Sequence, residues 1–206
     1  MARWEPDARG RLETAAMDLF RERGYVGTTV EDIAARAGLT ERTFFRYFAD
    51  KREVLFSGAK ELEKSIVLGI AGAPDAVSPL EAVVSAFEAA GAELEDRRDI
   101  QYVRARYALV TAHAEIQERE LIKLAALAVA VTKALRARGV PEPTASVAAE
   151  AGIAVFKIGF ERWVSQKKPR DFARHIRAAA DVLKAVAAER KTTTVPHPKK
   201  KSTRRA

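Results

Sequence analysis

Apolar residues recur every three or four positions along most of the chain. In the first such segment they include Leu12, Ala15, Leu19 and Phe20, a spacing that places them on one face of an α-helix. No segment sustains an alternation of apolar and polar residues, and no Asn-Gly or Asp-Gly pair marks a hairpin. The pattern predicts an all-α protein of about nine helices.

Turn and capping residues divide the chain into these helices. Gly24 stands where a helix would end, and Thr29, followed three residues later by Asp32, is typical of a helix N-terminus. Gly38 would end the short helix that follows, and Thr40 would cap the next one. The remaining helices are expected near residues 51–70, 79–96, 99–117, 118–138, 143–167 and 170–190.

The short helix after Thr40 has two chemically different sides. Of the 15 aromatic residues in the chain, four lie between positions 44 and 48. At helical spacing Phe44, Tyr47 and Phe48 share one face, while Arg42 and Arg46 lie opposite them. The aromatic rings would hold the helix to its own domain, and the arginines would face outward.

Two short helices joined by a glycine-containing turn match the helix-turn-helix plan, whose second helix enters the major groove of DNA. The alternative is an ordinary amphipathic helix with arginine on its solvent face, and the helical geometry alone does not decide between the two. Local charge does not decide either, because residues 1–52 contain ten Arg/Lys and nine Asp/Glu.

Composition narrows the class of protein. The net charge is +8, but residues 191–206 hold six Lys/Arg and no Asp/Glu, which leaves 30 basic and 28 acidic residues in the rest of the chain. We expect this basic tail to be disordered, with either no role or a sequence-independent attraction to DNA. The absence of cysteine suits a cytoplasmic protein, and no uncharged apolar run is long enough to cross a membrane.

Residues 28–56, TTVEDIAARAGLTERTFFRYFADKREVLF, resemble the DNA-binding region of the tetracycline-repressor (TetR) family. The resemblance rests on a Thr cap, the Ile33-Ala34 pair, Ala37-Gly38, Thr43 with the aromatic residues after it, and Lys51. It implies a helix-turn-helix domain over residues 1–55, with the motif at about 32–51, and a helical ligand-binding and dimerisation domain over residues 56–190.

The resemblance also implies which residues contact DNA. They are Thr29, Thr40, Arg42, Thr43, Phe45, Tyr47 and Lys51, and Arg46 is added as a candidate phosphate contact. Phe45 departs from the family, which usually has Tyr there, so a hydroxyl contact is lost while the ring could still touch a thymine methyl.

A stripe of alternating small and large residues on the 143–167 helix is the candidate dimer interface. It consists of Gly152, Phe156, Gly159 and Trp163, which lie close together on one face. The pattern alone equally allows a contact within the chain, and the family resemblance favours the dimer.

The C-terminal helices are also expected to hold a mostly apolar ligand pocket with a few polar groups. Its candidates are Phe87, Tyr102, Arg106, Tyr107, His113 and Phe156, each of which could instead be an ordinary core or surface residue. The chain is further similar to the mycofactocin-type regulators, and that similarity implies an acyl-CoA-like ligand.

These features predict a ligand-responsive transcriptional regulator, a repressor that binds a near-palindromic operator as a homodimer. The alternatives are an all-α enzyme and a DNA-binding protein without a ligand. No HExxH, GxSxG, P-loop or GxGxxG pattern occurs, and the three histidines show no metal-ligand spacing, so we expect no enzyme, no metal and no cofactor.

Overall fold

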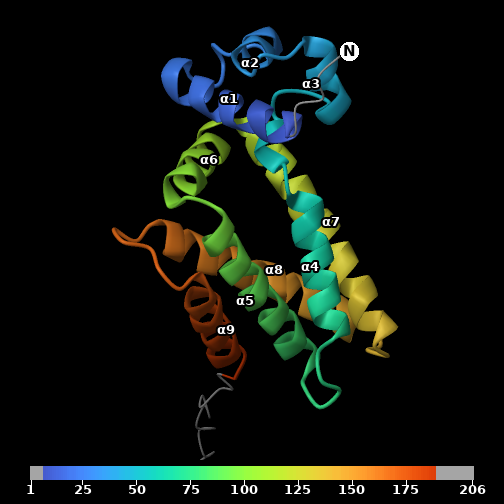
Figure 1. Ribbon diagram of the computed structural model, residues 1–206. Helices are drawn as coiled ribbons and strands as arrows, with labels where there is room; N and C mark the ends of the chain where they lie inside the picture. Colours follow the sequence, from blue (N-terminus) through green and yellow to red (C-terminus); the bar gives the residue numbers. More distant parts are fainter. Residues whose placement is uncertain (1–6, 189–206) are drawn as a thin grey trace, which may run out of the picture.

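The computed structural model describes residues 7–188, and this part of the chain contains nine α-helices and one short 3-10 helix but no strand (Figure 1). The helices are α1 (Ala8–Arg23), α2 (Val30–Arg36), α3 (Glu41–Tyr47), η1 (Glu53–Phe56), α4 (Ala59–Ala71), α5 (Pro79–Arg97), α6 (Ile100–Ala112), α7 (Ala114–Ala137), α8 (Thr144–Val164) and α9 (Phe172–Ala188). The predicted all-α fold is confirmed. The tail at 191–206 lies outside the described residues.

The capping predicted for the first three helices is present. Gly24 ends α1 in the left-handed region, with a φ of 75°. Thr29 and Asp32 exchange hydrogen bonds between side chain and backbone at the start of α2, which is a capping box. Gly38, with a φ of 65°, turns the chain into α3, and the Thr40 side chain accepts a hydrogen bond from the Thr43 N–H.

The buried apolar residues form two separate cores. One core joins α1–α3 and η1, and it also takes in Val110 from α6 and Ile116 from α7. The other core lies among α4, α5, α7, α8 and α9. Helices α1–α3 therefore sit at one end of the molecule, where α6 and the start of α7 meet them (Figure 1).

Two helix boundaries differ from the sequence prediction. The expected helix at 51–70 is interrupted at Gly58, whose φ of 87° separates η1 from α4. The break expected near 117–118 falls instead at His113, which is extended with φ −125° and ψ 115°. No glycine or proline marks His113, so this break depends on the packing of the residues on either side into the N-terminal core.

The stripe predicted to form a dimer interface is packed inside the subunit. A Cβ added to Gly152 would come within 2.3 Å of a side chain on α5, and one added to Gly159 would come within 2.9 Å of the α9 backbone. Phe156 packs against an aromatic ring of α5, and Trp163 stacks on Phe172 with 4.7 Å between ring centroids. The interface prediction for these four residues is wrong, because the small residues serve the close approach of α8 to its own neighbours.

Candidate nucleic-acid interface and ligand cavity

Helix α3 buries one side and exposes the other. Phe44 is fully buried and Phe48 is nearly so, and their ring centroids lie 5.5 Å apart. Phe45 is 54% exposed and Tyr47 39% exposed, although neighbouring residues are buried. The inward packing of Phe44 and Phe48 predicted from the sequence is confirmed.

The exposed side of α3 carries cations that no carboxylate neutralises. Within residues 7–188, Arg42 has no ion pair, and Arg46 donates only to the Tyr47 hydroxyl, at 3.3 Å, while its guanidinium lies over the Tyr47 ring. Beside them Thr40 and Thr43 bring their hydroxyl oxygens within 3.1 Å of each other. This side of the helix therefore offers positive charge, hydroxyls and an exposed aromatic ring to an external partner.

Lys51 has a structural partner that the sequence did not indicate. Its ammonium donates to the Tyr25 and Thr28 carbonyl oxygens at 2.7 and 2.8 Å and lies 4.3 Å from the Tyr25 ring centroid. The side chain thus ties the residues after α3 to the loop between α1 and α2. Only one of its three N–H donors remains for the phosphate contact expected from the family resemblance.

A cavity of about 360 Å³ lies among α4, α5, α6, α7 and α8. Four of the six predicted pocket residues line it, namely Tyr102, Arg106, Tyr107 and Phe156. Phe87 does not line it, because it is fully buried in the core. His113 does not line it either: its ring packs 5.0 Å from the Tyr25 ring, between the N-terminal core and the body.

The charged residues that α7 contributes to this cavity were not predicted from the sequence. Glu120 accepts hydrogen bonds from Arg106, at 2.5 Å, and from Lys123, at 2.7 Å. Lys123 stands at the start of the apolar run LAALAVAVT, and a lone lysine there was the available signal. Together these side chains form a buried polar cluster within a mostly apolar wall.

Burial and neighbouring charge shift the titration of this cluster. The pKa of Lys123 is lowered to about 8, first by burial and then by the positive charge of Arg106, and the neighbouring Glu120 offsets these effects only in part. Burial would raise the pKa of Glu120, but Arg106 and Lys123 outweigh it, so the pKa of this carboxyl lies below its ordinary value. The cluster therefore holds a firmly ionised carboxylate and a lysine that loses its proton unusually easily.

Residues 13–57, from α1 to just past η1, match the family model "Bacterial regulatory proteins, tetR family". Over 88 residues the chain is 35% identical to the transcriptional regulator TcmR of Streptomyces glaucescens, covering 43% of this chain and 39% of TcmR. The N-terminal region of the chain is therefore similar to the tetR family of bacterial regulatory proteins.

Further comparisons agree with this assignment. The chain is 40% identical over 43 residues to MftR of Mycobacterium tuberculosis, named as a mycofactocin biosynthesis transcriptional regulator, and this match covers 21% of the chain and 22% of MftR. The chain thus spans well under half the length of these two relatives. The fold resembles a TetR-family regulator of Syntrophomonas wolfei, with a TM-score of 0.63, 21% identity, and coverage of 91% and 98% of the two chains.

A second solved structure with this fold is FadR of Thermus thermophilus in complex with lauroyl-CoA. Its TM-score is 0.55 and its identity 22%, with 92% of this chain and 98% of that one covered. At this level of identity the likeness concerns the fold alone.

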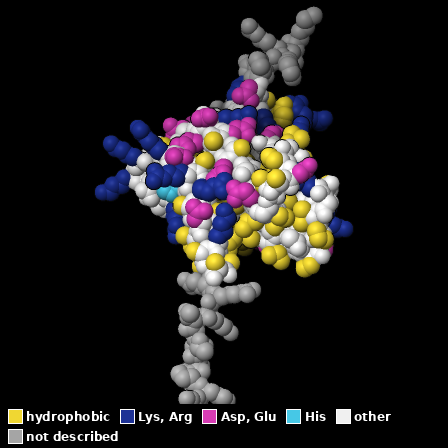
Figure 2. Space-filling model, turned by 90° about the horizontal axis from the view of Figure 1, so that it is seen from below, with side chains coloured by type: hydrophobic (Ala, Val, Ile, Leu, Met, Phe, Trp, Pro, Cys, Tyr) yellow, Lys and Arg dark blue, Asp and Glu magenta, His cyan; other side chains and the backbone are white. Residues whose placement is uncertain are grey.

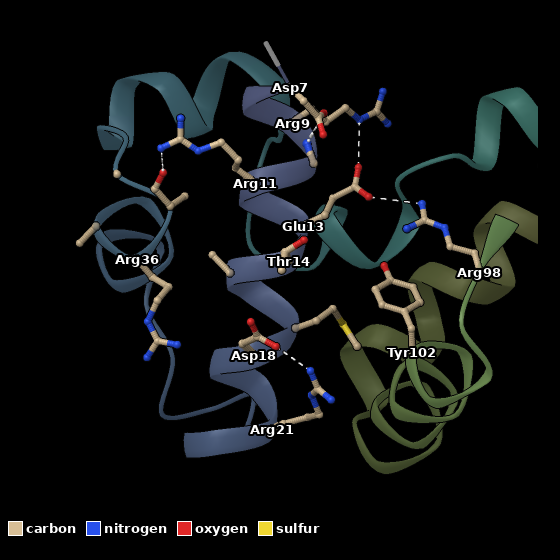
Figure 3. A pocket seen from close by; sticks show the side chains of 16 residues that line it. Asp7, Arg9, Arg11, Glu13, Thr14, Asp18, Arg21, Arg36, Arg98 and Tyr102 are labelled. Atoms are coloured by element: carbon tan, nitrogen blue, oxygen red, sulfur yellow. Dashed lines mark hydrogen bonds and ion pairs between the residues drawn. The ribbon is translucent and has the colours of Figure 1, made fainter. Parts of the chain in front are cut away.

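A wider, charged groove of about 950 Å³ runs along α1 (Figure 3). At its centre Glu13 of α1 is nearly buried and forms ion pairs with Arg9, at 3.4 Å, and with Arg98, at 3.3 Å. Arg98 also lies over the Tyr102 ring, 4.9 Å from its centroid. Because Arg98 and Tyr102 line both this groove and the cavity, they connect the cavity wall to α1.

Proposed function

We propose that the protein is a cytoplasmic, ligand-responsive transcriptional repressor. It binds a near-palindromic operator as a homodimer and leaves the operator when a small apolar or acyl-type effector occupies the cavity. The observation that carries this proposal is the exposed side of α3, whose cations have no carboxylate partner among residues 7–188, inside a region that matches the tetR family. The residue assignments for DNA contact remain those of the sequence analysis, with Lys51 reduced to at most one free N–H donor.

DNA binding is supported by the different roles of the two sides of α3, one buried and one exposed. A recognition helix must be fixed to its domain because its other side points into the major groove. Phe44 and Phe48 supply the fixing, while Arg42, Thr43 and Phe45 are free to approach base edges. Arg46 is placed to meet the phosphate backbone.

Response to a ligand is supported by the cavity. Its volume of about 360 Å³ falls within the ordinary range for small-molecule sites. Solved structures with this fold include FadR in complex with lauroyl-CoA and SmeT in complex with triclosan. A DNA-binding protein without a ligand would need no cavity among its C-terminal helices. The cavity therefore favours a ligand-responsive regulator.

A homodimer is supported by a different face of α8 and α9 from the one that the sequence suggested. Val147 and Ile158 on α8 are 65% and 45% exposed, and Val182 and Val186 on α9 are 49% and 64% exposed. Within each pair the spacing is helical, so each helix presents an outward apolar stripe. Hydrophobic side chains gather on one part of the surface seen from the end opposite α1–α3, and Lys and Arg project from another side (Figure 2). Exposed apolar side chains gathered on a protein surface are typical of an interface with another protein.

The DNA-binding proposal is tested by a gel shift with the intergenic DNA upstream of the gene. We expect a shift that a nonspecific duplex does not compete away and that weakens as salt is raised. The absence of any shift at low salt would contradict the proposal.

The dimer is tested by the substitutions Ile158→Glu and Val182→Glu, read by light scattering after size exclusion. Each places a charge in the apolar surface, so we expect a monomer in place of a dimer. Thr111→Glu, at an exposed position of α6, is the matched control and should leave the dimer intact. If the wild-type chain is itself a monomer at micromolar concentration, the interface is wrong.

A further inference from the structure

One end of the cavity is surrounded by cationic side chains. The Phe56 ring of η1 has the guanidinium groups of Arg106 and Arg119 at 5.2 and 5.0 Å from its centroid, and the ammonium of Lys123 at 5.8 Å. Phe56, Arg106 and Lys123 all line the cavity. The 3-10 helix η1 therefore meets the consecutive helices α6 and α7 at this end.

The carboxylates at this end do not balance the cations. Glu53 is engaged with Arg119 through two hydrogen bonds, so this pair is neutral. Arg106 and Lys123 share the single carboxylate of Glu120, which leaves one excess positive charge. The side chains of Arg106, Lys123 and Glu120 are only 19%, 18% and 19% exposed, so water screens that charge poorly.

An excess buried charge is unfavourable unless a counter-charge arrives. The depressed pKa of Lys123 has the same origin, because burial and the charge of Arg106 both oppose its ammonium form. An anionic group entering the cavity would supply the missing charge. A cationic group would be repelled by the excess positive charge.

We propose that the cavity takes a largely apolar molecule with one anionic group, and that Arg106 and Lys123 bind this group in competition with Glu120. This inference rests on the proposed function, since it names the chemical class of the effector. The apolar part would lie against Leu94, Leu124, Phe156 and Phe160, which line the same cavity.

The remaining charged groups of the cavity do not compete for the same position. Glu93 is engaged with Ser65 and Arg97, and Arg98 is paired with Glu13 across the groove. Glu61 also lines the cavity, but its side chain is largely exposed and is paired with Arg9. Glu161 and Lys157 lie on the exposed side of α8. Glu120 is therefore the carboxylate that an incoming anion must displace.

Arg106 also connects this position to the DNA-binding region. Its Nε donates to the Leu55 carbonyl oxygen at 2.6 Å, and Leu55 belongs to the N-terminal core. When an anion draws the guanidinium away from Glu120, the hydrogen bond to η1 must change with it. The occupant of the cavity is thus two contacts away from the core that fixes α3.

The test compares two probes that differ in charge but share an apolar chain, decanoate and decanamide, added to the full-length protein without DNA. Binding is measured by isothermal titration calorimetry at pH 7, below the concentration at which decanoate forms micelles. We expect decanoate to bind at least about tenfold more tightly, which corresponds to one well-placed charge-assisted contact. Equal affinities, tighter binding of decanamide, or no binding of decanoate would overturn the inference.

Two substitutions at the cluster should act in opposite directions. Lys123→Met should abolish the preference for decanoate, whereas Glu120→Gln should strengthen decanoate binding because the internal competitor is gone. Lys157→Met removes the same charge from the exposed rim and should leave the preference unchanged. If Glu120→Gln weakens decanoate binding while thermal melting shows a folded protein, the competition is wrong.

These outcomes are separable from failure of the proposed function. If the protein binds decanoate selectively but gives no gel shift, the proposed anion site is supported and the proposed repressor function is contradicted. If the protein shifts DNA but binds decanoate and decanamide equally, the proposed regulator function is supported and the proposed anion site is overturned.

Discussion

The exposed side of α3 and one end of the cavity both have cationic side chains next to aromatic rings. The two sites differ in how far these charges are exposed to solvent and paired with carboxylates. On α3 the guanidinium groups of Arg42 and Arg46 stand in solvent without a carboxylate partner among residues 7–188. In the cavity Arg106 and Lys123 are largely buried and share Glu120. Exposed charge costs little free energy and remains available to a large polyanion, whereas buried charge is unfavourable unless a counter-charge lies beside it.

The difference indicates two kinds of binding. The α3 surface can hold many phosphates and bases weakly and additively, and its binding should depend strongly on salt. The cavity can hold one small molecule with a defined charge, and water exclusion should make that contact less sensitive to salt. The following substitutions test this contrast, beginning with the largest expected effect.

Phe44→Ala and Phe45→Ala separate the anchoring side of α3 from its free side. Phe44 is fully buried, so its truncation should lower the free energy of unfolding by about 3–5 kcal/mol. Phe45 is 54% exposed, and its truncation should change stability much less while weakening DNA binding. Urea unfolding and gel shifts on both variants provide the measurement. Equal losses of stability would show that α3 has no free side.

Lys123→Met probes the buried side of the contrast through pH. In the folded protein the pKa of Lys123 is about 8, below its ordinary value of 10.5, so between these pH values the unfolded chain binds a proton that the folded protein does not. Stability should therefore rise with pH across this window, by up to about 3 kcal/mol. The variant should lack this rise in urea unfolding measured from pH 7.5 to 10. If the free energy of unfolding rose equally with pH in both proteins, a group other than Lys123 would be responsible for the rise.

Arg42→Ala tests whether the exposed charge reads sequence. If Arg42 contacts a base, the substitution should cost about 1–3 kcal/mol on the preferred operator and relax the preference at one position. Competition gel shifts against single-base operator variants measure this. Unchanged affinity for every DNA sequence would mean that α3 is oriented differently on the duplex.

Arg46→Ala should have the smallest effect of these five substitutions. A lost phosphate contact weakens binding uniformly across sequences and lowers the slope of log affinity against log salt by about one. Folding should change little, because Arg46 is exposed and its partner within the described chain is the neighbouring Tyr47 hydroxyl. A sequence-dependent loss would instead assign Arg46 to a base.

The N-terminal region could be predicted closely because its signals are local. Thr29, Gly38 and Thr40 set helix ends through contacts within a few residues, and the two sides of α3 follow from helical spacing. Lys51 is the exception, because its partners are the carbonyl oxygens of Tyr25 and Thr28, more than twenty residues away. A sequence pattern cannot show which distant carbonyl a flexible side chain will reach.

The C-terminal body was harder to predict, for the same reason. A stripe of small and large residues on α8 shows that something approaches closely, but α9 of the same chain and a second subunit would both produce it. Likewise, aromatic residues at helical spacing do not show which of them face a cavity, and Phe87 proved to be core.

The sequence by itself determined an all-helical chain, the helix-turn-helix with its anchoring aromatic residues, and the similarity of the N-terminal region to the tetR family. These depend on backbone propensity, capping and the period of the helix, which act over a few residues. Only the tertiary structure decided that α6 and α7 part at His113, that the α8 stripe is internal, and that Arg106 and Lys123 share Glu120 beneath Phe56. Those features arise where helices far apart in sequence bury one another's side chains, and the free energy of that burial depends on neighbours that no local pattern specifies.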